Sequence, residues 1–137
     1  MYELLYASLA TDSITGPEVK KILQASKANN EKHGITGMLV YSETEFVQLL
    51  EGEQIAVKTL YNKIRQDKRH RNTKIFYEGA IRSRSFDSWA MASQSLKVAI
   101  EKNNEIGEMI NETGPTFNFR YNPNQGKKIF AMLREFI

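Results

Sequence analysis

Residues 37–51, GMLVYSETEFVQLLE, contain two apolar segments joined by a short polar link, and this stretch determines the fold. Residues 37–42 and 45–51 are rich in apolar, β-branched and aromatic side chains, which favours strands. The link at residues 42–44 is polar and short. The sequence therefore predicts a β-hairpin in the middle of the chain.

A strand and a helix are predicted before this hairpin. Residues 2–8 alternate as a strand, with Tyr6 and Ser8 on the same face. A helix over 16–33 follows, with Thr15 and Glu18 as a capping box. Gly34 is a plausible helix stop. The inward stripe of this helix ends in polar groups: Val19, Ile22, Leu23, Ser26 and Asn30.

A second helix and two further strands are predicted after the hairpin. The helix at 53–66 has apolar residues at i, i+3, i+4 and i+7, namely Val57, Leu60, Tyr61 and Ile64. Residues 74–81 and 87–94 have the composition of strands. The predicted class is α+β, a ferredoxin-like βαββαββ sandwich with both helices on one sheet face.

The remaining residues, 95–137, are predicted to form a C-terminal two-helix extension that covers the other sheet face. The first helical stripe is Leu96, Ala99, Ile100, Ile106, Met109 and Ile110, and the second is Ile129, Phe130, Leu133 and Phe136. Gly114 and Pro115 separate the two helices. This divides the chain into a domain at 1–94 and an extension at 95–137 that serves signal output or oligomerisation.

Composition favours one cytoplasmic globular domain. The chain has 137 residues, 41% of them hydrophobic and 26% charged, and no cysteine. No membrane-length apolar run and no secretory leader is visible. The net charge of +3 comes largely from a basic run at 63–74. That run is either a solvated helix C-terminus or a phosphate site, and both readings remain open.

The residues that common enzymes and metal sites require are missing. His33 and His70 are far apart, so no metal site is predicted. The GITG segment at 34–37 is too short for a phosphate loop and precedes a strand. There is no nucleophile elbow and no pair of carboxylates in an apolar setting. Turnover catalysis is therefore not expected.

Hydrogen-bonding and polarisable side chains instead lie where the pattern predicts a buried strand face. They occur in residues 6–8 (YAS), 46–48 (FVQ) and 89–91 (WAM). Gln48 is the clearest case, because an unpaired buried amide costs about 1–3 kcal/mol. Either the Tyr6 hydroxyl and a backbone carbonyl satisfy it, or the strands form the wall of a pocket for a planar ligand.

Five motifs in order give the chain a family resemblance. They are residues 6–8 (YAS), 29–30 (NN) with 34–37 (GITG), 46–52 (FVQLLEG), 67–70 (DKRH) and 86–91 (FDSWAM). Together they resemble a BLUF domain, a blue-light sensor that uses flavin, over residues 2 to about 94. The resemblance implies noncovalent FAD, with FMN or riboflavin as possible substitutes, and places the isoalloxazine between the helices at 16–33 and 53–66.

The resemblance also implies roles for individual residues. Tyr6 gives an electron and then a proton to the excited flavin, and Gln48 bridges the tyrosine and the flavin. Apart from the resemblance, the order of the elements motivates the hypothesis that Trp89 and Met91 on the last strand relay the signal into residues 95–137. The implied cofactor-binding residues are Ser8, Ile22, Ser26, Asn29, Asn30, Phe46, Gln48, Lys63, Ile64, Asp67, Arg69 and His70. Some relatives carry Arg or His at the position of Lys63.

The expected function is that of a short, stand-alone photoreceptor whose reversible, red-shifted state changes its binding to itself or to a separate effector or regulator protein. A homo-oligomer is expected, and no contact with a membrane or nucleic acid. The alternative from a different class is a ferredoxin-like RNA- or protein-binding module without flavin. An RRM-like stacking platform is not visible, because Phe76 and Tyr77 alternate faces.

Overall fold

The computed structural model describes residues 1–11, 16–41, 45–86, 89–95, 110–111 and 118–119. The elements in chain order are β1 (Tyr2–Ala10), α1 (Gly16–Lys32), β2 (Thr36–Tyr41), β3 (Glu45–Gly52), α2 (Gln54–Gln66), β4 (His70–Ala80), β5 (Trp89–Ser95), β6 (Ile110–Asn111) and β7 (Asn118–Phe119). No helix in this described part is long and apolar enough to cross a membrane.

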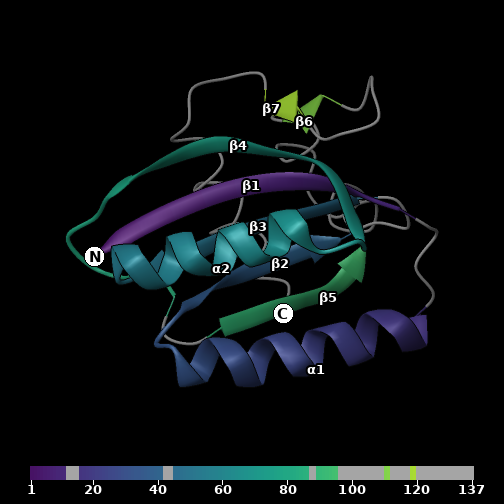
Figure 1. Cartoon of the computed structure of the whole chain (residues 1–137), viewed down its shortest axis with the longest axis horizontal. Coiled ribbons are helices and arrows are strands. Elements are labelled where there is room, and N and C mark those ends of the chain that lie inside the picture. Colours follow the sequence, from purple (N-terminus) through teal and green to yellow (C-terminus); the bar gives the residue numbers. More distant parts are fainter. Residues whose placement is uncertain (12–15, 42–44, 87–88, 96–109, 112–117, 120–137) are drawn as a thin grey trace.

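The main sheet has the strand order β4-β1-β3-β2-β5. The first four strands pair antiparallel, and β5 is added parallel to β2 at the edge. Figure 1 shows α2 across β1 and β3, and α1 beside β5. This arrangement confirms the predicted ferredoxin-like sandwich.

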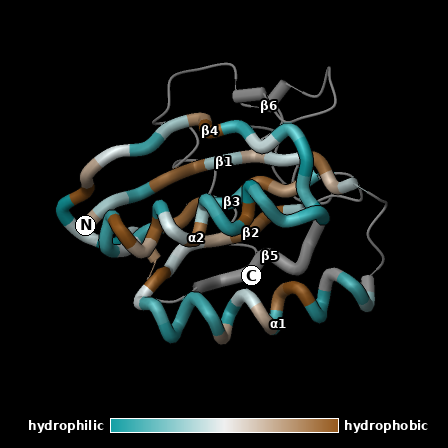
Figure 2. Tube along the Cα trace, viewed as in Figure 1, coloured by the Kyte–Doolittle hydropathy of each residue, from teal (hydrophilic) through white to brown (hydrophobic). Residues whose placement is uncertain are grey.

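The two central strands are buried along their whole length. Leu4 and Leu50 are cross-strand partners, and both contribute to a core cluster with Val57 and Tyr61 of α2. Figure 2 shows much of β1 and β3 in brown, whereas α1 and α2 alternate between brown and teal. The apolar stripe predicted for the second helix is therefore the face that packs on the sheet.

Two strands are longer than the sequence pattern predicts. β1 continues to Ala10, and β4 begins at His70 rather than at residue 74. Residues 70–74 are mostly polar and show no clear alternation, but the ladder pairs Ala10 with His70. Backbone pairing with β1 therefore extends β4 where side-chain pattern gives no signal.

The predicted C-terminal helices fall mostly on residues outside the described ranges. One assignment in that region was wrong: Ile110, which the sequence places in a helical stripe, lies in β6 and pairs with Phe119 of β7. Cross-strand pairing with Phe119 therefore overrides the helical spacing that the sequence pattern gives to Ile110.

Gly37 lies where β2 approaches β3 too closely for a side chain. Its φ of +149° is rare for other residues, and a Cβ there would lie 1.9 Å from the carbonyl oxygen of Leu49. Gly37 pairs with Leu50 on one side and with Trp89 on the other. The absence of a side chain at Gly37 is thus what lets β2 join β3 to β5.

We expect Gly37→Ala to lower the free energy of unfolding by about 3 kcal/mol or more, because the backbone of β3 must move. Urea denaturation of the two proteins measures this difference. Gly79→Ala is the matched control, since nothing lies within 4 Å of a Cβ added there. Its effect should stay within about 0.5 kcal/mol. Equal effects of the two substitutions would contradict the close approach at Gly37.

Candidate functional site

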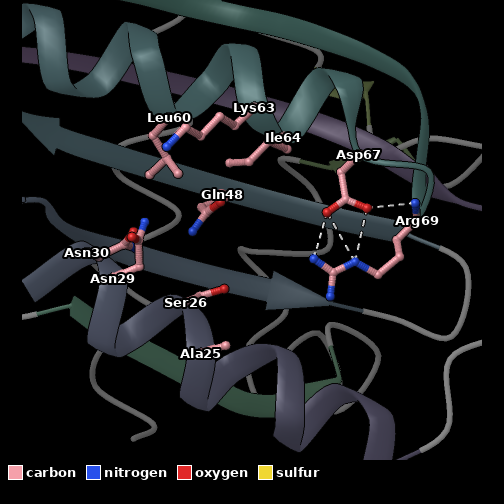
Figure 3. Close-up of a pocket in the computed structure, with 10 residues that line it drawn as sticks. All are labelled: Ala25, Ser26, Asn29, Asn30, Gln48, Leu60, Lys63, Ile64, Asp67 and Arg69. Carbon is pink, nitrogen blue, oxygen red and sulfur yellow. Dashed lines mark hydrogen bonds and ion pairs between the residues drawn. The ribbon is translucent and has the colours of Figure 1, made fainter.

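A cavity of about 210 Å³ lies between α1, α2 and the sheet. An adjoining hollow of about 370 Å³ shares Asn29, Leu60 and Lys63 with it. Figure 3 shows side chains from both helices and from β3 around one space. The cavity is lined by Ala25, Ser26, Asn29, Asn30, Gln48, Leu60, Lys63, Ile64, Asp67 and Arg69.

The sheet wall of this cavity carries a buried phenol–carboxamide pair. Tyr6 on β1 and Gln48 on β3 are direct cross-strand partners, so their side chains lie on the same face. The Tyr6 hydroxyl donates a hydrogen bond of 2.5 Å to Oε1 of Gln48, and the side chains are 1% and 4% exposed. The amide nitrogen of Gln48 points into the cavity in Figure 3. It is therefore placed to donate to a ligand there.

The surroundings of Tyr6 hold it as a neutral phenol. Burial is the main cause that raises the pKa of Tyr6 far above its usual value, and Tyr61 adds to the effect. The ring of Tyr61 on α2 meets that of Tyr6 at 5.4 Å between centroids, with an interplanar angle of 61°. This edge-to-face contact fixes the orientation of the Tyr6 ring.

Asn30 is positioned by the way in which α1 ends. The amide of Ile35 donates to the carbonyl of Asn30 at 2.9 Å, and the amide of Gly34 donates to Glu31 at 3.3 Å. These two bonds, together with φ of +67° at Gly34, form a Schellman motif. Gly34 is thus the helix stop that the sequence predicted.

The side chain of Asn30 leaves one donor unpaired. Asn30 is 1% exposed and lines the cavity, and its Nδ2 has no hydrogen-bond partner in the described part of the chain. Such a group costs free energy unless an acceptor reaches it. A ligand that presents carbonyl oxygens and a ring nitrogen acceptor, as flavin does, would pair with Asn30 and Gln48 together. The donor set therefore fits a flavin ring.

The mouth of the cavity holds an ion pair. Arg69 donates to both carboxylate oxygens of Asp67, with Nη2 to Oδ2 at 2.6 Å, as Figure 3 shows by dashed lines. This hydrogen bond is the main cause that lowers the pKa of Asp67 to about 2. Asp67 thus orients the guanidinium of Arg69, while Lys63 lines the same cavity from α2.

Three of the predicted cofactor residues form a separate cluster beside the cavity. Ser8 Oγ lies 2.7 Å from Nδ1 of His70, and the ring of Phe46 lies 4.8 Å from that of His70. Burial lowers the pKa of His70. These three residues and the half-buried Ile22 are not among those that line the cavity. Their predicted contacts with a cofactor stay predictions.

The structure thus brings together Ser26, Asn29, Asn30, Gln48, Lys63, Ile64, Asp67 and Arg69 around one cavity, with Tyr6 behind Gln48. Trp89 and Met91 are described through their backbone, and their side chains lie outside the described part. Sequence reasoning assigned no site role to Ala25, Leu60 or Tyr61. Leu60 and Tyr61 belong to the predicted apolar stripe, and that face also forms one wall of the cavity.

The Asp67–Arg69 pair predicts a pH dependence of stability. The pKa of Asp67 falls from 3.8 to about 2 on folding, so ionised Asp67 stabilises the folded state above pH 3.8 and this contribution is lost as pH falls towards 2. We expect Asp67→Asn to be less stable than the wild type at pH 7. In urea denaturation the difference should shrink between pH 4 and pH 2. Glu31→Gln, an exposed change on α1, is the control. A pH-independent difference would contradict this reading.

The fold and the cavity define a ligand-binding α+β domain, and comparison with known proteins identifies its family. The family model described as sensors of blue-light using FAD matches residues 1–92. The chain therefore belongs to the BLUF family of flavin-dependent blue-light sensors.

Two curated relatives show how this domain occurs in longer proteins. Photoactivated adenylate cyclase subunit alpha of Euglena gracilis is 40% identical over 85 residues, which is 62% of this chain and 8% of that protein. The blue light- and temperature-regulated antirepressor BluF of Escherichia coli K12 is 33% identical over 69 residues, which is 50% of this chain and 17% of BluF. The chain thus spans only a small part of these relatives.

Solved structures match over nearly the whole chain. The dark-state structure of the BLUF protein BlrB has a TM-score of 0.78 at 25% identity and covers 99% of this chain and 96% of that one. The ground state of BlsA has a TM-score of 0.74 at 28% identity and covers 96% and 86%. These likenesses agree with the ferredoxin-like fold described above.

Proposed function

We propose that this chain is a blue-light photoreceptor that binds FAD in the cavity between α1 and α2. The observation that carries the proposal is the pairing of a buried Tyr6–Gln48 hydrogen bond with the unpartnered Nδ2 of Asn30 on the same cavity. Family membership supports flavin as the ligand. FMN or riboflavin present the same ring and fit the same donors.

Each side chain has a distinct task in holding the cofactor. Asn30 donates to a ring carbonyl, and Asn29 assists it from the same helix end. Ile64 and Leu60 contribute apolar contacts from α2. Lys63 and Arg69 attract the phosphates at the mouth, with Arg69 held in place by Asp67. When bound, the flavin supplies absorption of blue light and accepts an electron and a proton.

Tyr6 is the electron and proton donor in this proposal. Its neutral phenol cannot lose a proton to solvent, because the side chain is buried and its hydroxyl is bonded to Gln48. Proton movement from Tyr6 therefore passes through the Gln48 carboxamide. The amide carries both donors and an acceptor, so it can face the phenol on one side and the cavity on the other.

Gln48 then stores the signal as a changed set of hydrogen bonds. Rotation or tautomerisation of its carboxamide alters the donors that face the cavity without breaking a covalent bond of the backbone. A flavin there would absorb slightly further to the red. The return of Gln48 to its first arrangement in darkness makes the change reversible.

The output is a change in binding to a separate effector or regulator protein, or to another copy of the chain. One exchanged hydrogen bond biases the fold by about 1–3 kcal/mol, which changes a partner's affinity by roughly 5–150-fold. A near-complete switch needs about 5.5 kcal/mol. The response is therefore graded unless an oligomer amplifies it.

Absorption spectra test the photochemical roles. We expect the purified protein to be yellow, to shift red under blue light, and to recover in darkness. Tyr6→Phe and Gln48→Leu should keep the colour and lose the shift, because each removes one partner of the hydrogen bond between Tyr6 and Gln48. A normal photocycle in Tyr6→Phe would remove Tyr6 from the mechanism. A folded, colourless protein that takes up no added FAD would refute the proposal.

Asn30→Ala separates flavin binding from folding. Without flavin the substitution removes a buried, unpaired amide, so the stability of the apoprotein should stay equal or rise. Flavin affinity should fall by about tenfold or more, which corresponds to one lost hydrogen bond. Titration calorimetry and urea denaturation measure the two effects. Asn62→Ala, an exposed change on α2, is the control. Unchanged flavin affinity in Asn30→Ala would place the ring elsewhere.

A further inference from the structure

A buried carboxylate that the proposed photochemistry does not use lies three residues after Gln48 on β3. Glu51 has no exposed surface. Because side chains alternate along a strand, Glu51 lies on the sheet face opposite to Gln48. A carboxylate in such a place is costly unless donors surround it. The hydrogen-bond donors around Glu51 therefore show which segments its carboxylate holds together.

Three donors converge on the Glu51 carboxylate, and two of them are backbone amides. The amide of Phe86 donates to Oε1 at 2.7 Å, and that of Ser85 donates to Oε2 at 2.9 Å. The hydroxyl of Thr36 on β2 donates to Oε1 at 3.1 Å. One side chain thus ties the loop that follows β4 to both strands of the central hairpin.

Arg84 completes this Glu51 cluster, which consists of Thr36, Glu51, Arg84, Ser85 and Phe86. Nη1 of Arg84 donates to the Thr36 hydroxyl at 2.9 Å and to the backbone carbonyl of Glu51 at 3.1 Å. The side chain of Phe86 is buried as well. Residues 84–86 are therefore held by several charge-assisted bonds at one point.

Residues 84–86 of the Glu51 cluster lie shortly before β5 in the chain. Phe86 precedes the first residue of β5, Trp89, by three positions, and Thr36 precedes Gly37, the partner of Trp89. β5 is an edge strand, since β2 is its only ladder partner in the described sheet. The Glu51 cluster thus anchors the beginning of a strand that has one neighbour.

The site residues and β5 meet in one row across the sheet. Tyr6 pairs with Gln48, Gln48 with Leu39, and Leu39 with Met91. A rearrangement at Gln48 therefore reaches β5 at Met91, two residues after the first residue of the strand and five residues after Phe86 of the Glu51 cluster. A strand held at one end responds at a defined register, whereas an unanchored edge strand absorbs the displacement by sliding or fraying.

We propose that Glu51 is a positioning residue for signal output: by binding the amides of Ser85 and Phe86, it holds the start of β5 so that a change at Gln48 is transmitted along that strand. This inference rests on the proposed function for its light-dependent part. The anchoring itself is independent of flavin.

Amide hydrogen exchange in the dark tests the anchoring. In Glu51→Gln the carboxamide keeps one acceptor but presents an N–H group where the carboxylate accepted a second amide. We expect the amides of Ser85 and Phe86 and those of β5 to exchange about tenfold faster or more. Thr36→Val is a milder second variant that removes only the hydroxyl. Glu53→Gln, which is exposed and makes no capping bond, is the matched control.

Trp89 is the only tryptophan, so its fluorescence reports on β5 during illumination. We expect Glu51→Gln and Thr36→Val to keep the flavin colour and the red shift but to lose most of the light-minus-dark change in Trp89 emission that the wild type shows. The output role is overturned by any of three results. These are a light-minus-dark change in Trp89 emission as large in both variants as in the wild type, a wild-type emission that does not change on illumination, and loss of the red shift in both variants.

Failure of the proposed function and failure of the anchoring by Glu51 give different results. A wild type without a red shift refutes the proposed function, and with it the light-dependent part of this inference. Unchanged exchange at Ser85 and Phe86 in Glu51→Gln, in a protein that still shifts red, refutes the anchoring alone. If Glu51→Gln does not fold, exchange and emission in Thr36→Val decide both points.

Discussion

The hydrogen bond from Tyr6 to Gln48 is the interaction on which the rest of the site depends. It joins the two central strands at a direct cross-strand pair, where neither side chain can turn to solvent. Because Tyr6 occupies the amide oxygen, the amide nitrogen must find its acceptor in the cavity. The sheet wall of the cavity therefore presents an amide donor that needs an acceptor. The unpaired nitrogen of Asn30 presents a second such donor from α1.

The pairing of the strands offers a path by which a change in the Tyr6–Gln48 hydrogen bond could be transmitted to the edge of the sheet. Residues of four strands lie in one row, from Tyr6 through Gln48 and Leu39 to Met91. Backbone ladders hold the row together, and the missing side chain at Gly37 allows the close approach of β2 to β3 two pairs away from it. A stiff central hairpin transmits a displacement better than a loop does, because its buried groups have few alternative arrangements.

The sequence predicted the features that depend on one segment alone. Alternation along a strand and the spacing along a helix show which face of that segment is buried. Tyr6 and Gln48 were placed on a buried face by period two, and the stripe that ends in Asn30 by helical spacing. Pairings between distant segments carried no such signal. The ladder of Ala10 with His70, the bond of Ser8 to His70 and the Glu51 cluster join residues 15 to 62 positions apart. Asp67 and Arg69 were both predicted as cofactor-binding residues, but the sequence carried no signal for the hydrogen bond between the carboxylate and the guanidinium.

β3 carries a buried polar group on each of its faces, Gln48 on one and Glu51 on the other, and the two differ in how tightly they are held. Gln48 can exchange hydrogen bonds, because its carboxamide has one partner among the described residues and faces a cavity. Glu51 is held in place instead, because three donors among the described residues occupy its carboxylate oxygens, and it lines neither of the two hollows described above. An exchange worth about 1–3 kcal/mol moves only an element whose two positions are already close in free energy. β5 has one ladder partner in the described sheet, so few backbone bonds oppose its displacement. In the role proposed for Glu51, the anchor at one end keeps the small bias from being spread over the whole strand.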